Sequence, residues 1–183
     1  MPIGAVAAVP HIAAQMLMRR PERVLDLGMG TGFYGAVVRQ WADEGVAPWR
    51  TWIVGVEAFS SYRNPLWDLY NVVFSMTIEE YLARHFEQFD HVLFNDVLEH
   101  FDHAIGESLL RHLTSLVAPG GVLFVNTPAL FHPQQAAHGN ELERHRSLWR
   151  AEELAALGFE IILNGTEPQY GCFPTLLASW RAR

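Results

Sequence analysis

Short runs of apolar and β-branched residues recur along this chain, and most of them are followed by turn residues and then by a segment with helical spacing. This alternation of strand and helix is typical of an open, mostly parallel sheet with helices on both of its faces. We therefore predict an α/β fold. The predicted strands are residues 23–27, 51–56, 71–75, 91–94, 122–125, 159–163 and 176–180.

The segments between these strands carry helix starts and stops. Pro21 disfavours helical geometry in the residue before it, so a first helix should end near Arg20. Thr77, followed three residues later by Glu80, predicts a capping box that opens another helix. Further helices are predicted over residues 33–41, 109–117 and 152–157, and a long polar loop over residues 127–146.

Length and composition indicate one domain. The chain has 183 residues, half of them apolar, which is enough to fill a single core, so residues 1–183 are treated as one domain with 1–20 as a covering helix. The formal net charge is −7, and the basic residues form no long run. Because nucleic-acid binders gain affinity from clustered Lys and Arg, we expect no nucleic-acid partner.

The N-terminal stretch Pro2–Met18 is apolar, but its charges follow it at Arg19 and Arg20. This order is the reverse of a signal peptide. The single cysteine, Cys172, cannot form an internal disulfide, and no stretch reaches the roughly 18 uninterrupted apolar residues of a membrane span. These features favour a cytoplasmic protein without a membrane partner, and they leave the oligomeric state open.

The strand over residues 23–27 runs directly into a glycine-rich turn and a helix. Gly28, Gly30 and Gly32 permit positive φ and a close approach of a ligand to the backbone, while the helix start offers unpaired N–H donors. A dinucleotide fingerprint would place its third glycine where this chain has Phe33. The pattern therefore predicts a nucleotide or nucleoside site without a pyrophosphate cradle.

The run Val24–Gly32 resembles motif I of class I S-adenosylmethionine-dependent methyltransferases, with Asp26 at the acidic position. The resemblance continues along nearly the whole chain: Glu57 ends the second strand, residues 89–100 look like the family's fourth-strand motif, and residues 116–123 look like the loop before its fifth strand. It implies a single-domain, Rossmann-like fold with a seven-stranded, mostly parallel sheet and an antiparallel last strand. It also implies S-adenosyl-L-methionine as the cofactor.

The resemblance assigns residues to that cofactor. Glu57 matches the acidic residue that accepts hydrogen bonds from both ribose hydroxyls, and Asn95 matches the residue that lines the methionine part. Many relatives carry Asp or Glu after the third strand for the adenine amino group, where this chain has Met76, Thr77 and Ile78. Adenine recognition would then use Thr77 or main chain near Ile78, if it occurs there; for Thr77 itself we favour the role of a helix cap. The implied cofactor-binding residues are Asp26, Gly28, Met29, Gly30, Glu57, Ala58, Thr77, Ile78 and Asn95.

The methyl acceptor leaves a weaker trace, because the sulfonium cofactor is already activated and no covalent nucleophile is required. We expect Cys172 to be a packed or semi-exposed thiol rather than a nucleophile. The catalytic group is not identified; its candidates are Asp96, His100 and His145. For any one aromatic residue in the loops near the carboxyl ends of the strands, we expect core packing rather than contact with the acceptor. The aromatic and histidine side chains of these loops are Phe59, Tyr62, Trp67, Phe131, His132, His138, His145 and Trp149.

Asp96, Glu99 and His100 have the i, i+3, i+4 spacing that would place them on one face of a helix after the fourth strand. The spacing resembles the Glu-x-x-Glu-His arrangement that binds a divalent ion in small-RNA 3'-terminal 2'-O-methyltransferases, where a segment like residues 145–149 supplies another histidine. The simpler interpretation is that Glu99 and His100 bond to neighbouring main chain and His145 lines the acceptor pocket. We favour the interpretation without a metal.

The sequence therefore predicts methyl transfer from S-adenosylmethionine to an oxygen or nitrogen of a small metabolite or saccharide-like acceptor. One alternative is metal-assisted 2'-O-methylation of an RNA 3' end, which the acidic composition disfavours. A second alternative is a protein that binds the cofactor without catalysis, such as an inactive partner subunit of a true enzyme, because cofactor binding alone does not establish methyl transfer.

Overall fold

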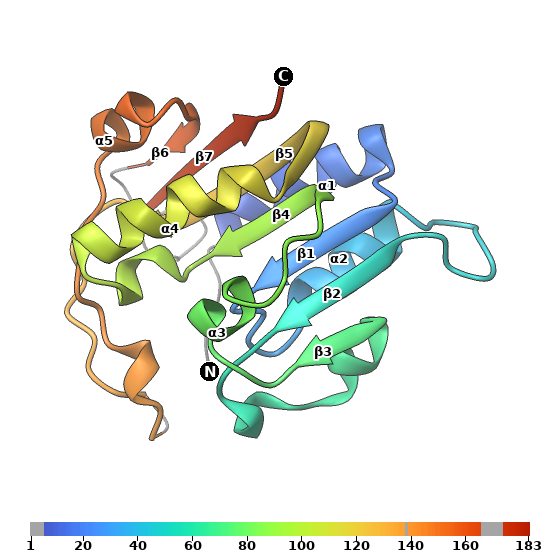
Figure 1. Cartoon of the computed structure of the whole chain (residues 1–183), viewed down its shortest axis with the longest axis horizontal. Coiled ribbons are helices and arrows are strands. Elements are labelled where there is room, and N and C mark those ends of the chain that lie inside the picture. The colour runs from blue at the N-terminus through green and yellow to red at the C-terminus, as the bar shows by residue number, and fades with distance from the viewer. Residues whose placement is uncertain (1–5, 138, 166–173) are drawn as a thin grey trace.

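A computed structural model describes residues 6–137, 139–165 and 174–183 of the chain. Its centre is a seven-stranded sheet in the order β3-β2-β1-β4-β5-β7-β6 (Figure 1). β7 runs antiparallel to both β5 and β6, and the other neighbouring strands are parallel. The predicted α/β fold with an antiparallel last strand is confirmed. The strands are β1 (Arg23–Leu27), β2 (Trp52–Val56), β3 (Val72–Phe74), β4 (Phe89–Asn95), β5 (Val117–Pro128), β6 (Glu160–Asn164) and β7 (Thr175–Arg181).

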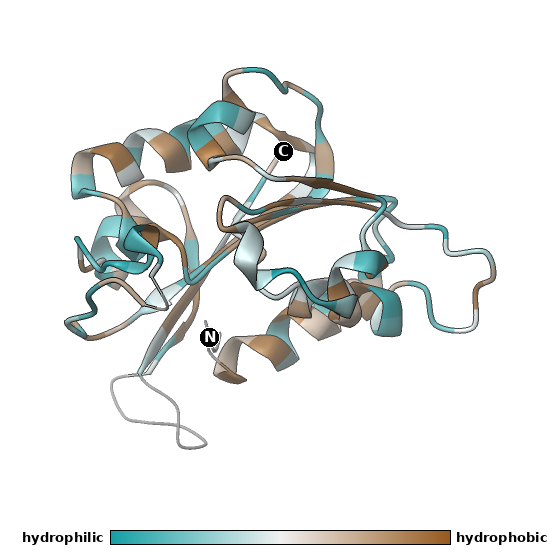
Figure 2. Ribbon diagram, turned by 90° about the horizontal axis from the view of Figure 1, so that it is seen from below, coloured by the Kyte–Doolittle hydropathy of each residue, from teal (hydrophilic) through white to brown (hydrophobic). Residues whose placement is uncertain are grey.

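Helices cover both faces of the sheet. α4 crosses in front of β4 and β5 in Figure 1, whereas α1 and α2 lie behind the sheet. Each face has its own buried apolar cluster, and Figure 2 shows the hydrophobic strands nearly edge-on between the two helical layers. The α-helices are α1 (Val9–Arg19), α2 (Phe33–Trp41), α3 (Ile78–Leu82), α4 (His103–Ser115) and α5 (Ala151–Ala156). Single 3-10 turns are η1 (Val6–Ala8), η2 (Ser60–Tyr62), η3 (Pro65–Leu69), η4 (Leu98–His100) and η5 (Glu141–Glu143).

Local capping signals act as predicted. The Thr77 side chain accepts a hydrogen bond from the Glu80 N–H, and the Glu80 carboxylate accepts from the Thr77 N–H, so the capping box of α3 is confirmed. The helix before β5 ends at Ser115, earlier than expected, and residues 118–121 belong to β5 rather than to a loop. The turn predicted around Pro168 and the environment of Cys172 lie outside the described residues.

The helix predicted directly after β4 is wrong. Asp96 has a φ of 53°, in the left-handed region, and only the 3-10 turn η4 follows it. The left-handed residue breaks the helical path, and α4 begins later, at His103. Asp96, Glu99 and His100 are therefore not stacked on one face of an α-helix.

The order of the strands creates a crevice. β1 and β4 are neighbours although β2 and β3 separate them in sequence, so the connections after β1 and β4 leave in opposite directions. In open α/β sheets, ligands bind outside the carboxyl ends of the strands at such a switch point. Asp26, Glu57 and Asn95 stand at or next to the carboxyl ends of β1, β2 and β4. Among the described residues, no helix is both long and apolar enough to cross a membrane.

The opposite end of β4 holds a buried histidine with a predictable effect on stability. His91 is 1% exposed, and neither ring nitrogen has a hydrogen-bond partner in the part of the chain that the structure describes. Burial lowers the pKa of His91 to about 4, and the positive charges of Arg19 on α1 and Arg181 on β7 contribute to this decrease. The negative charge of the adjacent Asp90 acts in the opposite direction. The unfolded chain takes up this proton near pH 6.5 and the folded chain does not, so acid favours unfolding.

We expect this histidine to lower the free energy of unfolding by about 2 kcal/mol between pH 7 and pH 5. Urea unfolding at several pH values should show that dependence, and His91→Leu should remove it. His11→Leu is the matched control, because His11 is exposed on α1. An equal dependence on pH in His91→Leu and the unaltered protein would contradict the assignment.

Candidate functional site

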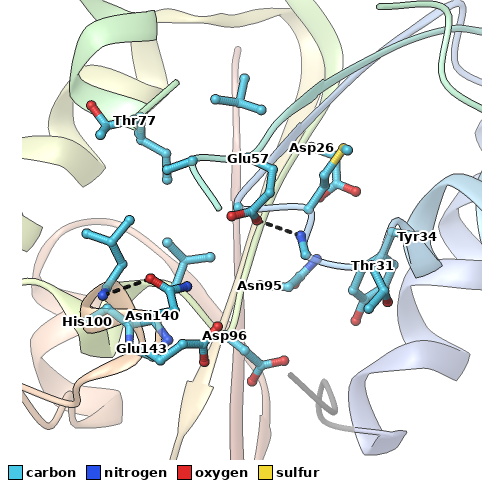
Figure 3. A pocket seen from close by; sticks show the side chains of 18 of the residues that line it. Asp26, Thr31, Tyr34, Glu57, Thr77, Asn95, Asp96, His100, Asn140 and Glu143 are labelled. Carbon is cyan, nitrogen blue, oxygen red and sulfur yellow. Dashed lines mark hydrogen bonds between the residues drawn. The ribbon is translucent and has the colours of Figure 1, made fainter. Parts of the chain in front are cut away.

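A cavity of about 670 Å³ lies over the carboxyl ends of β1, β2 and β4 (Figure 3). Its lining contains all nine residues that the sequence assigned to a cofactor: Asp26, Gly28, Met29, Gly30, Glu57, Ala58, Thr77, Ile78 and Asn95. They come from four segments that are far apart in the sequence. The strand order brings these segments together, so the predicted residues share one space.

The loop after β1 needs its glycines. Gly28, Gly30 and Gly32 have φ values of 69°, 53° and 86°, which L side chains rarely adopt. The N–H groups of Gly28 and Met29 donate to the Val56 carbonyl oxygen, at 2.9 and 3.1 Å, so the loop is fixed to β2. The loop therefore lines the cavity in a defined conformation.

Glu57 is buried at the end of β2 and holds two neighbouring segments. Its Oε2 accepts from the Gly30 N–H at 2.9 Å, and its Oε1 accepts from the Phe59 N–H at 2.8 Å. Burial raises the pKa of this carboxyl, although both backbone donors oppose the rise. Each carboxylate oxygen can accept more than one hydrogen bond, so both oxygens can also accept from ligand hydroxyls in the cavity.

Asp26 is buried beneath the same loop. The Tyr70 hydroxyl donates to Asp26 Oδ2 at 2.5 Å and itself accepts from the Gly35 N–H at 3.0 Å. Burial raises the pKa of Asp26 to about 7, although the Tyr70 hydrogen bond acts against the rise. Sequence analysis did not identify this partner, because Tyr70 lies 44 residues away along the chain.

Asn95 ends β4 with an amide that has no partner among the described residues. The residue is 7% exposed, and neither its Nδ2 nor its Oδ1 forms a hydrogen bond. A buried amide without partners costs free energy, and its place in the cavity wall indicates a ligand with both donors and acceptors. Figure 3 shows Asn95 and Glu57 in the central part of the cavity.

The segment after β3 forms another wall, from Met76 to Glu79. The Thr77 hydroxyl already accepts from the Glu80 N–H at 3.2 Å, so Thr77 acts as the helix cap, the role that we favoured from the sequence. Glu79 supplies a carboxylate that sequence reasoning did not select.

A further part of the lining comes from the segment after β4 and from the loop after β5. The Asp96 N–H donates to the Asn126 carbonyl oxygen at 2.8 Å, and the Asp96 Oδ1 accepts a hydrogen bond from the Asn126 Nδ2 at 2.7 Å. His100 Nδ1 lies 3.3 Å from the Arg144 carbonyl oxygen, and burial lowers the pKa of His100. Figure 3 shows Asp96 and His100 on the same side of the cavity as Glu143.

The loop predicted over 127–146 does reach the cavity, but through residues that were not predicted: Asn140, Leu142, Glu143 and Arg146. Glu143 Oε1 accepts from the Tyr62 hydroxyl at 2.7 Å, which fastens the loop to η2. The described aromatic and histidine candidates do not line the cavity: Phe59, Tyr62, Trp67, Phe131, His132, His145 and Trp149. Trp67 and Trp149 are instead buried in the two cores, and His138 is outside the described residues.

Ligand atoms of Glu99, His100 and His145 lie within 4.8 Å of one another. Glu99 is buried and accepts from the Thr127 hydroxyl at 3.0 Å, while His145 Nδ1 lies 2.6 Å from the His132 carbonyl oxygen. Asp96 is not part of this group, and of the three only His100 lines the cavity. The structure thus brings together three of the four residues considered for a metal. Of the simpler interpretation, the hydrogen bond of His100 to main chain is present, whereas Glu99 bonds the Thr127 side chain and His145 does not line the cavity.

A family model described as a methyltransferase domain matches residues 6–162. No curated protein sequence matches the chain. One similar solved structure is 1,6-didemethyltoxoflavin-N1-methyltransferase of Burkholderia thailandensis with its acceptor and S-adenosylhomocysteine: identity is 20%, the TM-score is 0.66, and 96% of this chain and 78% of that one are covered.

Two other solved structures share the fold. Magnesium protoporphyrin IX methyltransferase of Synechocystis, solved with S-adenosylmethionine, has 14% identity and a TM-score of 0.62 over 97% of this chain and 79% of that one. The N-methyltransferase NodS of Bradyrhizobium japonicum has 14% identity and a TM-score of 0.57 over 97% of each chain.

Proposed function

This chain belongs to the class I S-adenosylmethionine-dependent methyltransferase family, and we propose that it methylates an oxygen or nitrogen of a small metabolite or saccharide-like acceptor. The observation that carries the proposal is the cavity, whose wall contains all nine residues assigned to the cofactor. The similar proteins that were solved with S-adenosylmethionine or S-adenosylhomocysteine support the same choice of cofactor.

The residues present fit this cofactor. The Asn95 amide, buried without a partner, suits the charged amino-acid end, which carries both donors and acceptors. Glu57 keeps acceptor capacity for the two ribose hydroxyls, and the loop Gly28–Gly30 lines the cavity in a conformation that its hydrogen bonds fix. When bound, S-adenosylmethionine supplies an activated methyl group.

The chain's own contribution is to position the acceptor, exclude water and receive a proton. A carbonyl oxygen can only accept, so the hydrogen bond to Arg144 places the proton of His100 on Nδ1 and leaves the lone pair on Nε2. The lowered pKa of His100 keeps the ring neutral at pH 7. His100, which lines the cavity, is therefore our proposed proton acceptor, with Asp96 beside it on the same wall.

Calorimetry with S-adenosylhomocysteine tests the cofactor assignment directly. We expect saturable binding at one site and no comparable binding of a nicotinamide dinucleotide. Incubation with labelled S-adenosylmethionine and a panel of acceptors then tests turnover. Binding without transfer to any acceptor would favour the partner-subunit alternative, and preferential binding of the dinucleotide would make the cofactor assignment wrong.

We expect Glu57→Ala to weaken binding of S-adenosylhomocysteine by about 1.5 to 3 kcal/mol, because it removes charge-assisted hydrogen bonds to the ribose. The variant also removes the acceptor of the Gly30 N–H, so the loop loses an anchor. Glu57→Gln, which keeps one acceptor oxygen, should lose less affinity, and the exposed Glu44 supplies the control Glu44→Ala. An unchanged affinity of Glu57→Ala for S-adenosylhomocysteine would show that Glu57 does not bind the cofactor.

The cluster of Glu99, His100 and His145 keeps metal-assisted transfer to an RNA 3' end as a second candidate. We expect the simpler alternative to hold, with methyl transfer insensitive to chelator and no metal bound by elemental analysis. His145→Ala is the informative variant, because this residue belongs to the cluster and does not line the cavity. A chelator-sensitive activity that His145→Ala also abolishes would establish the metal.

A further inference from the structure

The cavity carries an excess of negative charge at the end that the cofactor residues do not occupy. Asp96 and Glu143 line that end, and Arg146 is the only Lys or Arg among the described lining residues. The Arg146 guanidinium donates to the His100 main-chain oxygen at 3.0 Å, which directs it to the loop itself. An acceptor entering here therefore meets two carboxylates and a neutral imidazole.

Glu143 is held so that its charge stays in the cavity. The Tyr62 hydroxyl donates to its Oε1 at 2.7 Å, and the Gln134 amide approaches its Oε2 at 3.3 Å. The charge acts on the surrounding groups: burial raises the pKa of Glu57, and Glu143 raises it further. A positively charged ligand would relieve this repulsion, whereas an anionic ligand would add to it.

The two carboxylates make this end rich in hydrogen-bond acceptors, because an ionised carboxyl group accepts and does not donate. An ammonium group has three donors and no acceptor, so it complements such a surface better than a hydroxyl, a carboxylate or a phosphate.

Much of the remaining cavity wall is apolar. Val6 and Val9 from the N-terminal segment, Phe33, Phe101 and Leu142 contribute to the lining. Pockets of this composition bury the hydrocarbon body of a ligand and orient it through a few polar groups. The polar groups here are those that favour a cation.

We propose that the acceptor is a primary or secondary amine with an apolar body, bound as its ammonium ion at the end of the cavity that Asp96 and Glu143 line. This inference rests on the proposed methyltransferase function. The ammonium ion has no lone pair for methylation, so it must first lose one proton. His100 Nε2 accepts that proton and leaves a neutral amine and an imidazolium ion, whose charge the two carboxylates stabilise.

Calorimetry with three probes of one ring size tests the inference: benzylamine, benzyl alcohol and benzoate, each titrated near pH 7 into protein saturated with S-adenosylhomocysteine. We expect benzylamine to bind at least about ten times more tightly than the other two. Tighter binding of the alcohol or of benzoate, or no binding of benzylamine at millimolar concentration, would overturn the inference.

Two isosteric variants show whether the recognition is electrostatic. Glu143→Gln keeps an oxygen for the Tyr62 hydroxyl and removes the charge, so benzylamine should bind about tenfold more weakly while benzyl alcohol is unaffected. Glu141→Gln is the matched control on the same loop, because Glu141 pairs with Arg144 and does not line the cavity. Equal effects of the two variants would contradict a role for Glu143.

Saturating the protein with S-adenosylhomocysteine first distinguishes a failure of the proposed methyltransferase function from a failure of the amine inference. If S-adenosylhomocysteine does not bind, the proposed function fails, and the same three titrations into the ligand-free protein still decide the charge preference. If S-adenosylhomocysteine binds and the amine is not preferred, only the amine inference fails.

Discussion

We expect Arg39→Ala to lower the free energy of unfolding by about 3 to 5 kcal/mol, because it leaves a buried carboxylate without its partner. Arg39 Nη1 lies 2.6 Å from Asp43 Oδ2, and the two side chains are 6% and 0% exposed. For a chain of this size, the loss corresponds to a fall in Tm of roughly 6 to 20 °C. Thermal and urea unfolding of the purified variant would measure it.

The guanidinium connects three elements, which is why the expected effect is large. Besides the ion pair, it donates to the main-chain oxygens of Leu69 and Thr51 and to Asn71 Oδ1. It therefore joins α2 to the start of β2 and to the segment before β3. Asp43 in turn accepts hydrogen bonds from the N–H and the hydroxyl of Thr51. Burial alone would raise the pKa of Asp43, but the hydrogen bonds from Arg39 and Thr51 hold it below its usual value.

The chain offers a matched control for this pair. Arg111 and Glu107 also form an i, i+4 ion pair, at 2.8 Å, but their side chains are 65% and 42% exposed on α4. Exposed pairs of this kind contribute about 0.3 to 0.5 kcal/mol. The free energy of unfolding of Arg111→Ala should therefore be almost the same as that of the unaltered protein. Similar losses in the two variants would mean that burial and the extra hydrogen bonds of Arg39 do not matter.

Most of the fold could be predicted because its signals are local. The capping box of Thr77 and Glu80 depends on residues three positions apart, and the strand over residues 23–27 shows itself as an apolar run before a glycine turn. The error after β4 has the opposite character. Nothing in the local sequence requires Asp96 to adopt a positive φ; the contacts with Asn126, 30 residues away, hold it there.

The candidate site divides in the same way. Residues that form the ends of strands could be placed from their motifs, and all of them line the cavity. The partners that hold the side chains of the site in place could not be predicted, because they are distant in sequence: Tyr70 is 44 residues from Asp26, and Tyr62 is 81 residues from Glu143. Trp67 and Trp149 are buried in the cores, as we expected for any one of the aromatic side chains near the strand ends, because large apolar rings gain most from burial.

Gly28 combines both kinds of constraint, and we expect Gly28→Ala to weaken binding of S-adenosylhomocysteine roughly 100-fold. At a φ of 69°, an L side chain costs about 1 to 2 kcal/mol. A Cβ would also lie 2.5 Å from Val97 Cγ2, and overpacking of this kind costs about 1 to 3 kcal/mol. Both costs fall on the loop conformation that faces the ligand, and 100-fold corresponds to about 2.7 kcal/mol.

Gly45→Ala separates the two costs. Gly45 also has a φ of 69°, but nothing lies within 4 Å of the position that its Cβ would take, and the residue is remote from the cavity lining. The control should lose about 1 to 2 kcal/mol of stability from the backbone alone and keep its affinity for S-adenosylhomocysteine. Calorimetry on both variants, after unfolding curves show that each is folded, distinguishes the cases. Retained affinity in Gly28→Ala would show that Val97 can move aside and that the loop tolerates a side chain, because the backbone strain is the same at both positions.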